Sequence, residues 1–200
     1  MFSSLQIDVL REVSNIGCGN AATALSTMLS KRIDMEVPSV NVLPLADTPD
    51  LLGGAEALVT GVFFQASDGL SCSILWVLEQ DSVGKLLSLL FNIDVPSQPP
   101  YSAIEQSALM EVGNILSSSY LGALSSFTGL GFQLSVPALA TDMAGAILDI
   151  ALMQLSSYSD HVLLIKNSLR VGDESVEANF LLLPDTTLIQ RIFVSLGITE

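Results

Sequence analysis

The chain has 200 residues, half of them hydrophobic and 14% charged, so it can bury one sizeable core. Seven Lys and Arg residues stand against 21 Asp and Glu residues, and the net charge of −14 argues against nucleic acid and anionic membranes as partners. Cys18 and Cys72 are too few and too far apart for a disulfide scaffold or metal site, which favours a reducing cytoplasm.

The first half of the chain is predicted to begin and end with a helix. Its opening segment, MFSSLQIDVLRE, lacks the basic and long apolar regions of a secretory signal. Ser3 and Gln6 instead have the spacing of a capping box, in which each side chain bonds the other residue's backbone amide at a helix start. The expected elements are a helix at about 3–30, strands at Ala55–Ala66 and Leu70–Leu78 around a turn at Ser67-Asp68-Gly69, and a helix at about Asp81–Phe91.

The second half repeats this order of elements after a proline-rich connector. Residues 96–100 contain three prolines and cannot continue a helix. Ser102 and Glu105 then form a second capping-box pattern, 99 residues after the first. The expected elements are a helix at about 102–127, strands at Ala146–Leu155, His161–Val171 and Val176–Leu183 with turns at Ser156–Asp160 and Gly172–Ser175, and a helix at about Asp185–Leu196.

The repeated order of helix, strands and helix predicts an α+β fold. We expect two layers, in which the long helices pack on a mainly antiparallel sheet, and a pseudo-two-fold internal duplication. The whole chain, 1–200, would then be a single domain made of two repeats, about 1–95 and 102–200, joined by the linker at 96–100.

One uncharged stretch, residues 112–141, raises the question of a membrane span. It contains Asn114, Gln133 and Pro137 together with four glycines and several serines. The corresponding stretch of the first half carries charges. We therefore interpret residues 112–141 as a largely buried segment of a soluble protein.

The same polar pattern occurs once in each half. Between residues 8–38 and 107–137, ten of 31 aligned positions are identical, and six of these are apolar and typical of a core. A core does not explain why a Glu and an Asn also match. The first copy consists of Asp8, Glu12, Asn15 and Pro38, and the second consists of Ser107, Glu111, Asn114 and Pro137.

Helical geometry places these polar residues on one exposed ridge. At about 100° per residue, Asp8, Glu12 and Asn15 fall nearly opposite the apolar face of the first helix. Small residues follow along the same ridge, which indicates a surface that another protein approaches closely. An alternative is a pair of ordinary amphipathic helices that kept Glu and Asn by chance. The apolar face predicted for the first helix contains Ile7, Leu10, Val13, Ala21, Ala24, Leu25 and Met28.

The pattern resembles the signature of the CheC/CheX/FliY family of chemotaxis phosphatases, which is Asp or Ser, three residues, Glu, two residues, Asn, 22 residues and Pro. Both copies match this signature at every position, and the segment EVSNIGCGNAATALS also resembles the first helix of CheC. Two motifs without a further flagellar-switch domain make the chain most similar to the CheC branch.

The resemblance implies an enzyme that hydrolyses the aspartyl phosphate of a CheY-like response regulator, without a cofactor or metal of its own. The regulator is expected to supply Mg²⁺ and a lysine, so the phosphatase needs only to position a water. An Asn would orient that water, a Glu would pair with the lysine, and the other motif residues would shape the interface and set the chain direction. The implied catalytic residues are Glu12, Asn15, Glu111 and Asn114, and the motif-supporting residues are Asp8, Pro38, Ser107 and Pro137.

Other functions remain open at this point. The chain could be a non-catalytic interaction module that regulates either the receptor deamidase CheD or the flagellar switch. The resemblance also implies CheD as a partner. Gly17, Cys18 and Gly19 superficially match a dinucleotide fingerprint, but they lie inside a predicted helix, where they indicate a kink or a close helix approach instead. His161 stands alone beside a predicted turn, which disfavours a metal site or a catalytic triad.

Overall fold

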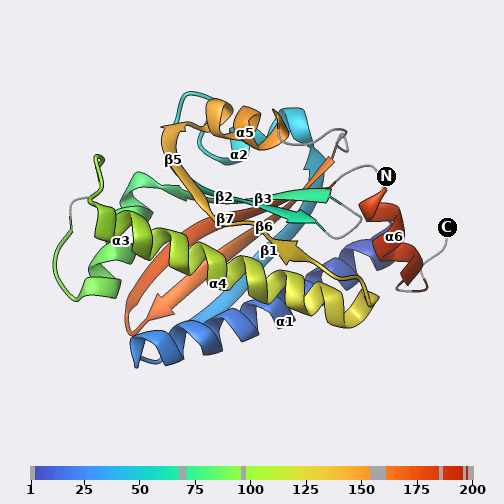
Figure 1. Cartoon of the computed structure of the whole chain (residues 1–200), viewed down its shortest axis with the longest axis horizontal. Coiled ribbons are helices and arrows are strands. Elements are labelled where there is room, and N and C mark those ends of the chain that lie inside the picture. Colours follow the sequence, from blue (N-terminus) through green and yellow to red (C-terminus); the bar gives the residue numbers. More distant parts are fainter. Residues whose placement is uncertain are drawn as a thin grey trace.

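The computed structural model describes residues 3–67, 71–95, 98–153, 161–184, 187–195 and 197. Within these residues one antiparallel sheet crosses the molecule (Figure 1). Its strand order is β1-β6-β7-β3-β2-β4, and β5 also pairs with β2. The strands are β1 (Asp34–Pro44), β2 (Leu58–Ser67), β3 (Ser71–Glu79), β4 (Gln133–Leu134), β5 (Ala138–Met143), β6 (His161–Val171) and β7 (Glu174–Pro184).

Two long helices begin at the predicted capping boxes. The Ser3 amide donates to Gln6 Oε1 at 2.8 Å, and the Ser102 amide donates to a Glu105 carboxylate oxygen at 2.6 Å. Each serine hydroxyl accepts in return from the amide three residues later. The helices are α1 (Ser4–Leu29), α2 (Thr48–Leu51), α3 (Gln80–Phe91), α4 (Ala103–Thr128), α5 (Ala144–Met153) and α6 (Leu188–Ser195).

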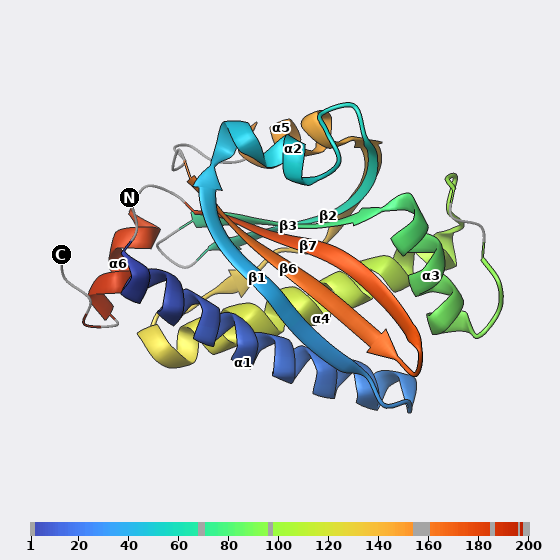
Figure 2. The same cartoon turned by 180° about the vertical axis from the view of Figure 1, so that it is seen from behind.

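The order of elements is the same in both halves. The first half runs α1, β1, α2, β2, β3, α3, and the second runs α4, β4 and β5, α5, β6, β7, α6. The sheet order mirrors this about its centre, because β7, β6 and β1 follow outward on one side as β3, β2 and β5 do on the other (Figure 2). The predicted α+β fold with a pseudo-two-fold duplication is therefore confirmed. The division into repeats at 1–95 and 102–200 stays a prediction with which this order agrees.

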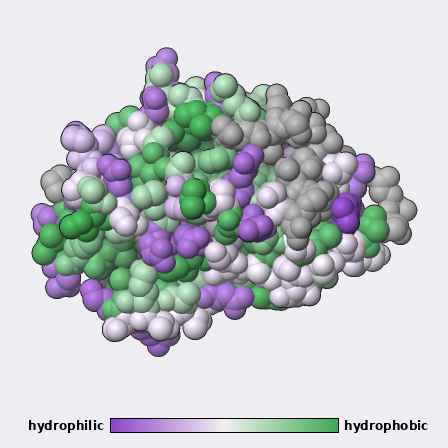
Figure 3. Space-filling view, in the orientation of Figure 1, coloured by the Kyte–Doolittle hydropathy of each residue, from purple (hydrophilic) through white to green (hydrophobic). Residues whose placement is uncertain are grey.

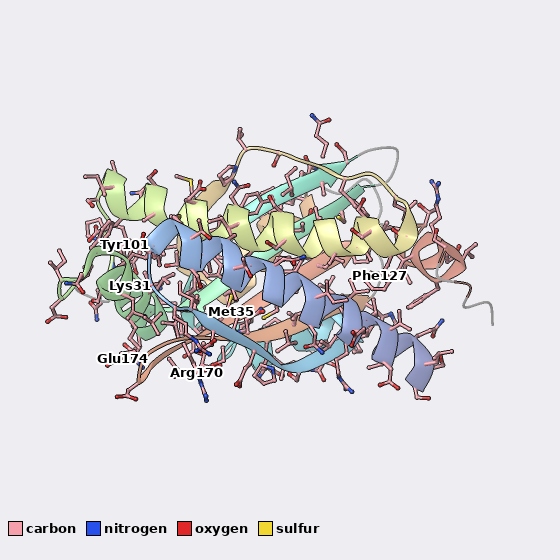
Figure 4. The ribbon with its side chains drawn as sticks, turned by 90° about the horizontal axis from the view of Figure 1, so that it is seen from below. Lys31, Met35, Tyr101, Phe127, Arg170 and Glu174 are labelled. Carbon is pink, nitrogen blue, oxygen red and sulfur yellow. The ribbon has the colours of Figure 1, made fainter. Side chains whose placement is uncertain are left out.

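The larger core lies between the sheet and the two long helices. Helices α1 and α4 lie side by side and run in opposite directions across one face of the sheet (Figures 1 and 4). Phe64, Trp76 and Phe180 of the sheet belong to this core, together with Leu25 of α1 and Leu116 of α4. All five side chains are nearly inaccessible to solvent, so burial of their apolar surface fixes the helices on the sheet.

The prediction of a strand at Ala146–Leu155 is wrong. Helix α5 occupies residues 144–153, while 154 and 155 lie outside the described residues. Its buried side chains follow the helical spacing i, i+3, i+4 and i+7, and alanine and leucine favour a helix. With α2 it covers part of the other face of the sheet, over a second core that includes Leu75, Val77 and Leu181. The buried residues of α5 are Ala144, Ile147, Leu148 and Ala151.

The buried face of α1 differs in part from the prediction. Leu10, Val13, Ala21 and Leu25 are buried as expected, whereas Ala24 and Met28 are exposed. The helix packs against α4 as well as against the sheet, and this rotates its buried face toward the neighbouring helix. The unexpected buried residues are Ser14, Gly17 and Cys18.

The remaining boundaries agree with the prediction to within a few residues. The helices at 3–30, 102–127 and Asp81–Phe91 are confirmed, and so are four of the predicted strands. The sequence pattern does not predict strands β1, β4 and β5 or the short helix α2. The whole of the predicted turn at 156–160 lies outside the described residues, and so do parts of the turn at 67–69, of the linker at 96–100 and of the last helix. Among the helices that the structure describes, none combines the length and apolar character needed to cross a membrane.

Candidate functional site

The four residues of the second motif line one open groove. Ser107, Glu111 and Asn114 come from the ridge of α4, and Pro137 comes from the segment between β4 and β5. We call this the motif groove. It has a volume of about 370 Å³, and its other lining residues are Met110, Leu134, Ser135 and Val136. Residues far apart in sequence thus form one continuous surface, which includes Pro137 although the sequence predicts for it only a role in chain direction.

The wall of the motif groove opposite α4 is formed by residues 135–137, where the edge strand is interrupted between β4 and β5. Strands β4 and β5 both pair with β2, on either side of residues 135–137. The Gln65 amide donates to Ser135 Oγ at 2.9 Å, and the Ser135 amide donates to the Gln65 carbonyl at 2.8 Å. Val136 is 87% exposed. Proline cannot donate to a strand ladder and belongs at such a break, so Pro137 both redirects the chain and lines the groove.

The first motif has the same strand irregularity. The pairing of β1 with β6 shifts register between Glu36 and Ser39, and Pro38 lies within this irregularity. Pro38 is exposed. Both motif prolines therefore sit where an edge strand departs from regular pairing, which agrees with their predicted role in setting chain direction.

Helix α4 rests directly on the sheet beneath the second motif. A Cβ on Gly113 would lie 3.1 Å from Val62 Cγ1 and 3.3 Å from Trp76 Cε3, both of the sheet. Gly113 falls between Glu111 and Asn114, so this close approach supports both side chains from below. Glu111 is exposed and Asn114 is half-buried. A rigid helix on a packed sheet is a suitable support for a side chain that must position a reactant.

The first motif lies on an exposed ridge of α1 but carries a different charge pattern. Asp8, Glu12 and Asn15 are all exposed, as predicted. Arg11 Nη1 lies 3.4 Å from Asp8 Oδ1, an ion pair one helical turn long on the solvent side. The second motif has the uncharged Ser107 and Met110 at the corresponding positions. The two sites thus share Glu and Asn but offer partners different surroundings.

The two motifs point away from the sheet near opposite ends of the paired helices. Figure 4 shows α1 and α4 in front of the sheet, with Lys31 and Tyr101 at one end and Phe127 at the other. Each motif lies in the first half of its own helix, and the helices run in opposite directions. Both sites are therefore open to a partner protein approaching from this face.

Alternative chemistries find little support in the described part of the chain. There, no group of three or more His, Cys, Asp and Glu side chains is placed to hold a metal ion. Cys18 is buried inside α1, and burial raises the pKa of its thiol to about 11, so it is a poor nucleophile near neutral pH. Gly17, Cys18 and Gly19 lie within α1, not between a strand and a helix, which excludes the dinucleotide reading.

Known proteins resemble this chain in sequence and in fold. A model of the CheC-like family matches residues 5–42 and 104–140, which include both motifs. The CheY-P phosphatase CheC of Bacillus subtilis is 34% identical over 199 residues, covering 96% of this chain and 94% of that protein. The motifs' resemblance to this family is thereby confirmed.

Solved structures show the same fold at low sequence identity. FliY of Thermotoga maritima superposes with a TM-score of 0.73 at 19% identity, covering all of both chains. The FliM middle domain of H. pylori superposes with a TM-score of 0.70 at 10% identity, covering 97% of this chain and 99% of that one. Because a relative aligns at 34% identity along nearly the whole chain and the family model matches both halves, the chain belongs to the CheC-like family.

Proposed function

We propose that the protein hydrolyses the aspartyl phosphate of a CheY-like response regulator, with one Glu/Asn pair inserted from each long helix. The observation that carries this proposal is the motif groove, where Ser107, Glu111, Asn114 and Pro137 line one surface open to solvent. The similarity to the CheY-P phosphatase of Bacillus subtilis supports the choice of substrate. An open groove on a helix ridge suits a protein substrate better than a small molecule, which usually binds in a more enclosed pocket.

The proposed reaction requires a correctly positioned water and does not require a strong acid or base from the phosphatase. A water oxygen attacks the phosphorus, the bond from phosphorus to the aspartate oxygen breaks, and the products are phosphate and a free carboxylate. The regulator itself is expected to hold Mg²⁺ and a lysine at the phosphoryl group. The phosphatase then adds one oriented water, and the Asn114 carboxamide can hold it without bringing a negative charge near the phosphoryl oxygens.

Glu111 has a different proposed role. A carboxylate beside the attacking water would repel the phosphoryl oxygens, whereas the same carboxylate can pair with the regulator's lysine. Glu111 and Asn114 are one turn apart on α4, so both side chains reach the same partner surface. Glu12 and Asn15 have the same spacing on α1 and take the same roles. Asp8 and Ser107 shape the edge of each site.

The test is the decay rate of the phosphorylated regulator. Wild type, Asn15→Ala, Asn114→Ala and the double variant are added to the phosphorylated cognate regulator, and released phosphate is followed. We expect acceleration by wild type and a fall of roughly 10–10³-fold in the double variant, as for loss of a positioned water. The two single variants then apportion the activity between the sites. A folded wild-type protein that does not accelerate decay would refute the proposal.

The predicted binding of CheD and a role in the flagellar switch stay predictions. The likeness to the FliM middle domain is one of fold alone, at 10% identity. Loss of hydrolysis in the double Asn variant with unchanged CheD binding would show that the two roles use separate surfaces. Loss of both would indicate a shared surface or misfolding, which circular dichroism distinguishes.

A further inference from the structure

A second groove adjoins the motif groove. It lies between the end of α1, the end of α3 and the start of α4, and it has a volume of about 460 Å³. We call it the apolar groove. Ser107 and Glu111 line both grooves, so the two surfaces are continuous. The apolar side chains along it are Met28, Leu29, Leu90, Phe91, Ala103, Ile104 and Ala108.

Two of these apolar side chains, Ile104 and Met28, are exposed to solvent instead of packing into the core. Ile104 is 71% exposed and Met28 is 43% exposed. The space-filling view shows hydrophobic side chains gathered at this end of the molecule, around the start of α4 (Figure 3). The solvent face of a helix is ordinarily polar, and contiguous exposed apolar side chains mark sites of contact with other molecules.

The duplication preserves this exposure. Residue Leu5, which lies 99 positions before Ile104, is 58% exposed, and Phe127, which lies 99 positions after Met28, is 45% exposed. Leu5 lies near the start of α1 and Phe127 near the end of α4, whereas Ile104 lies near the start of α4 and Met28 near the end of α1. Each motif helix therefore begins with an exposed apolar residue, and the other long helix ends with one. Burial in the core cannot account for the match, because all four side chains face solvent. The apolar pair thus accompanies the Glu/Asn pair in both halves.

We infer that the apolar groove receives an aliphatic or aromatic side chain of the same phosphorylated regulator that presents its phosphoryl group to Asn114. This inference rests on the proposed function and adds to it the surface that selects the partner. It assigns to Ile104 and Met28 the binding of the regulator and leaves the positioning of water to Asn114.

The size of a protein interface favours this occupant. A specific complex covers roughly 800 Å² on each partner, far more than four motif side chains supply. A globular regulator centred on Asn114 must therefore also cover neighbouring surface, and the apolar groove is continuous with the motif groove through Ser107 and Glu111. The net charge of −14 gives no long-range attraction toward a regulator with an acidic phosphorylation pocket, so local contacts supply the affinity, and apolar contacts add to the proposed Glu111 ion pair.

The experiment isolates the second site by starting from the Asn15→Ala parent. Ile104→Ser is added to this parent, and kcat and KM are measured with the phosphorylated regulator. We expect KM to rise roughly tenfold while kcat stays within about twofold, since loss of one buried aliphatic contact weakens binding without moving the water. Met153→Ser is the matched control: Met153 is 82% exposed on α5, which covers the other face of the sheet, and its loss should leave both constants unchanged.

The other possible results refute either the apolar groove as a docking site or the proposed function. An unchanged KM in Ile104→Ser, with hydrolysis intact in the parent, refutes the apolar groove as a docking site and leaves the proposed function standing. An inactive parent alongside an active wild type also refutes it, because the second site would then not act on the regulator. Absence of hydrolysis by wild type refutes the proposed function itself. If Ile104→Ser instead abolishes self-association in light scattering, the groove binds a second copy of this chain and the inference is wrong.

Discussion

Gly17 of α1 lies against the backbone of Tyr120 of α4. A Cβ on Gly17 would stand 2.9 Å from the Tyr120 Cα and 2.8 Å from its Cδ1. Real Cβ atoms essentially never approach so closely, so glycine permits the two helices to touch at this point. The sequence pattern at Gly17 had indicated such a close approach. Because both motifs lie on these two helices, the contact also sets their relative position.

Replacing Gly17 with alanine should therefore destabilise the protein. The added methyl group meets a backbone atom, which cannot move aside as a flexible side chain can, and we expect the free energy of unfolding to fall by about 1–3 kcal/mol. Gly122→Ala is the control, since its Cβ would meet nothing within 4 Å and alanine favours a helix by about 0.5–1 kcal/mol. Urea unfolding of both variants measures the two effects. Equal stability of Gly17→Ala and wild type would show that the helices can separate without cost.

A buried hydrogen bond joins α4 to the sheet beside this contact. The Tyr120 hydroxyl donates to Asn167 Oδ1, and Asn167 Nδ2 donates to the Ile165 carbonyl at 3.0 Å. Tyr120→Phe keeps the ring, whose centroid is 4.6 Å from that of Phe180, but leaves the Asn167 oxygen without this donor. Asn167 is 2% exposed, so water cannot readily replace the hydroxyl, and the free energy of unfolding should fall by about 1–3 kcal/mol.

Tyr101→Phe is the matched control for this prediction. The Tyr101 hydroxyl donates to Gln80 Oε1 at 2.5 Å, but Gln80 is half-buried whereas Asn167 is fully buried. We expect a smaller loss than for Tyr120→Phe in the same urea titration. A larger loss at Tyr101 would mean that burial of the acceptor does not decide the cost.

Much of the fold follows from local sequence signals. The two capping boxes predict where α1 and α4 begin, because a helix start needs specific side chains to satisfy its free amides. The helical periodicity of the apolar residues that follow predicts the helices themselves. Strand β1 was missed, since its residues 34–44 include Pro38, Pro44 and charged side chains that a sheet edge tolerates but a pattern does not reveal. The short apolar run that forms helix α5 fits either a helix or a strand until its neighbours are known, so its pattern alone wrongly predicts a strand.

The site was predictable in its helical half and not in the other. The spacing of Glu111 and Asn114 on one ridge is a property of the helix alone. The opposite wall of the motif groove depends on how β4 and β5 pair with β2 around Ser135 and Val136, which is a long-range contact. The apolar groove likewise joins the end of α1 to the start of α4, and only the packing of antiparallel helices brings these ends together.

Stability should fall as the solution becomes alkaline. Burial raises the pKa of the Cys18 thiol from 9.0 to about 11, and the negative charge of Glu36 acts in the same direction, while a hydrogen bond to Tyr120 acts against it. The unfolded chain then loses the thiol proton first. The contribution of Cys18 is therefore full below about pH 9 and is lost as the pH rises from about 9 through about 11.

The measurement is the urea midpoint between about pH 7.5 and pH 11, for wild type and Cys18→Ala. Burial also raises the pKa of Tyr120, so some loss of stability should remain in the variant. The wild-type curve should nevertheless fall more steeply above about pH 9 than that of Cys18→Ala. Parallel curves would show that the Cys18 thiol is not held protonated by the folded state.

Salt should separate the role of Glu111 from the overall charge of the protein. At low salt, a chain of net charge −14 repels an acidic regulator, so the affinity should first improve as salt is added. At higher salt, the proposed pair of Glu111 with the regulator's lysine is screened as well, and the affinity should decline again.

Glu111→Gln removes the pair but keeps the size of the side chain, so its affinity should be weaker and should lack the later decline. KM measured from about 10 to 500 mM NaCl tests this, with the Debye length falling through about 10 Å at 0.1 M. A steep loss of wild-type affinity from the lowest salt upward would contradict it, because long-range attraction would then dominate the encounter.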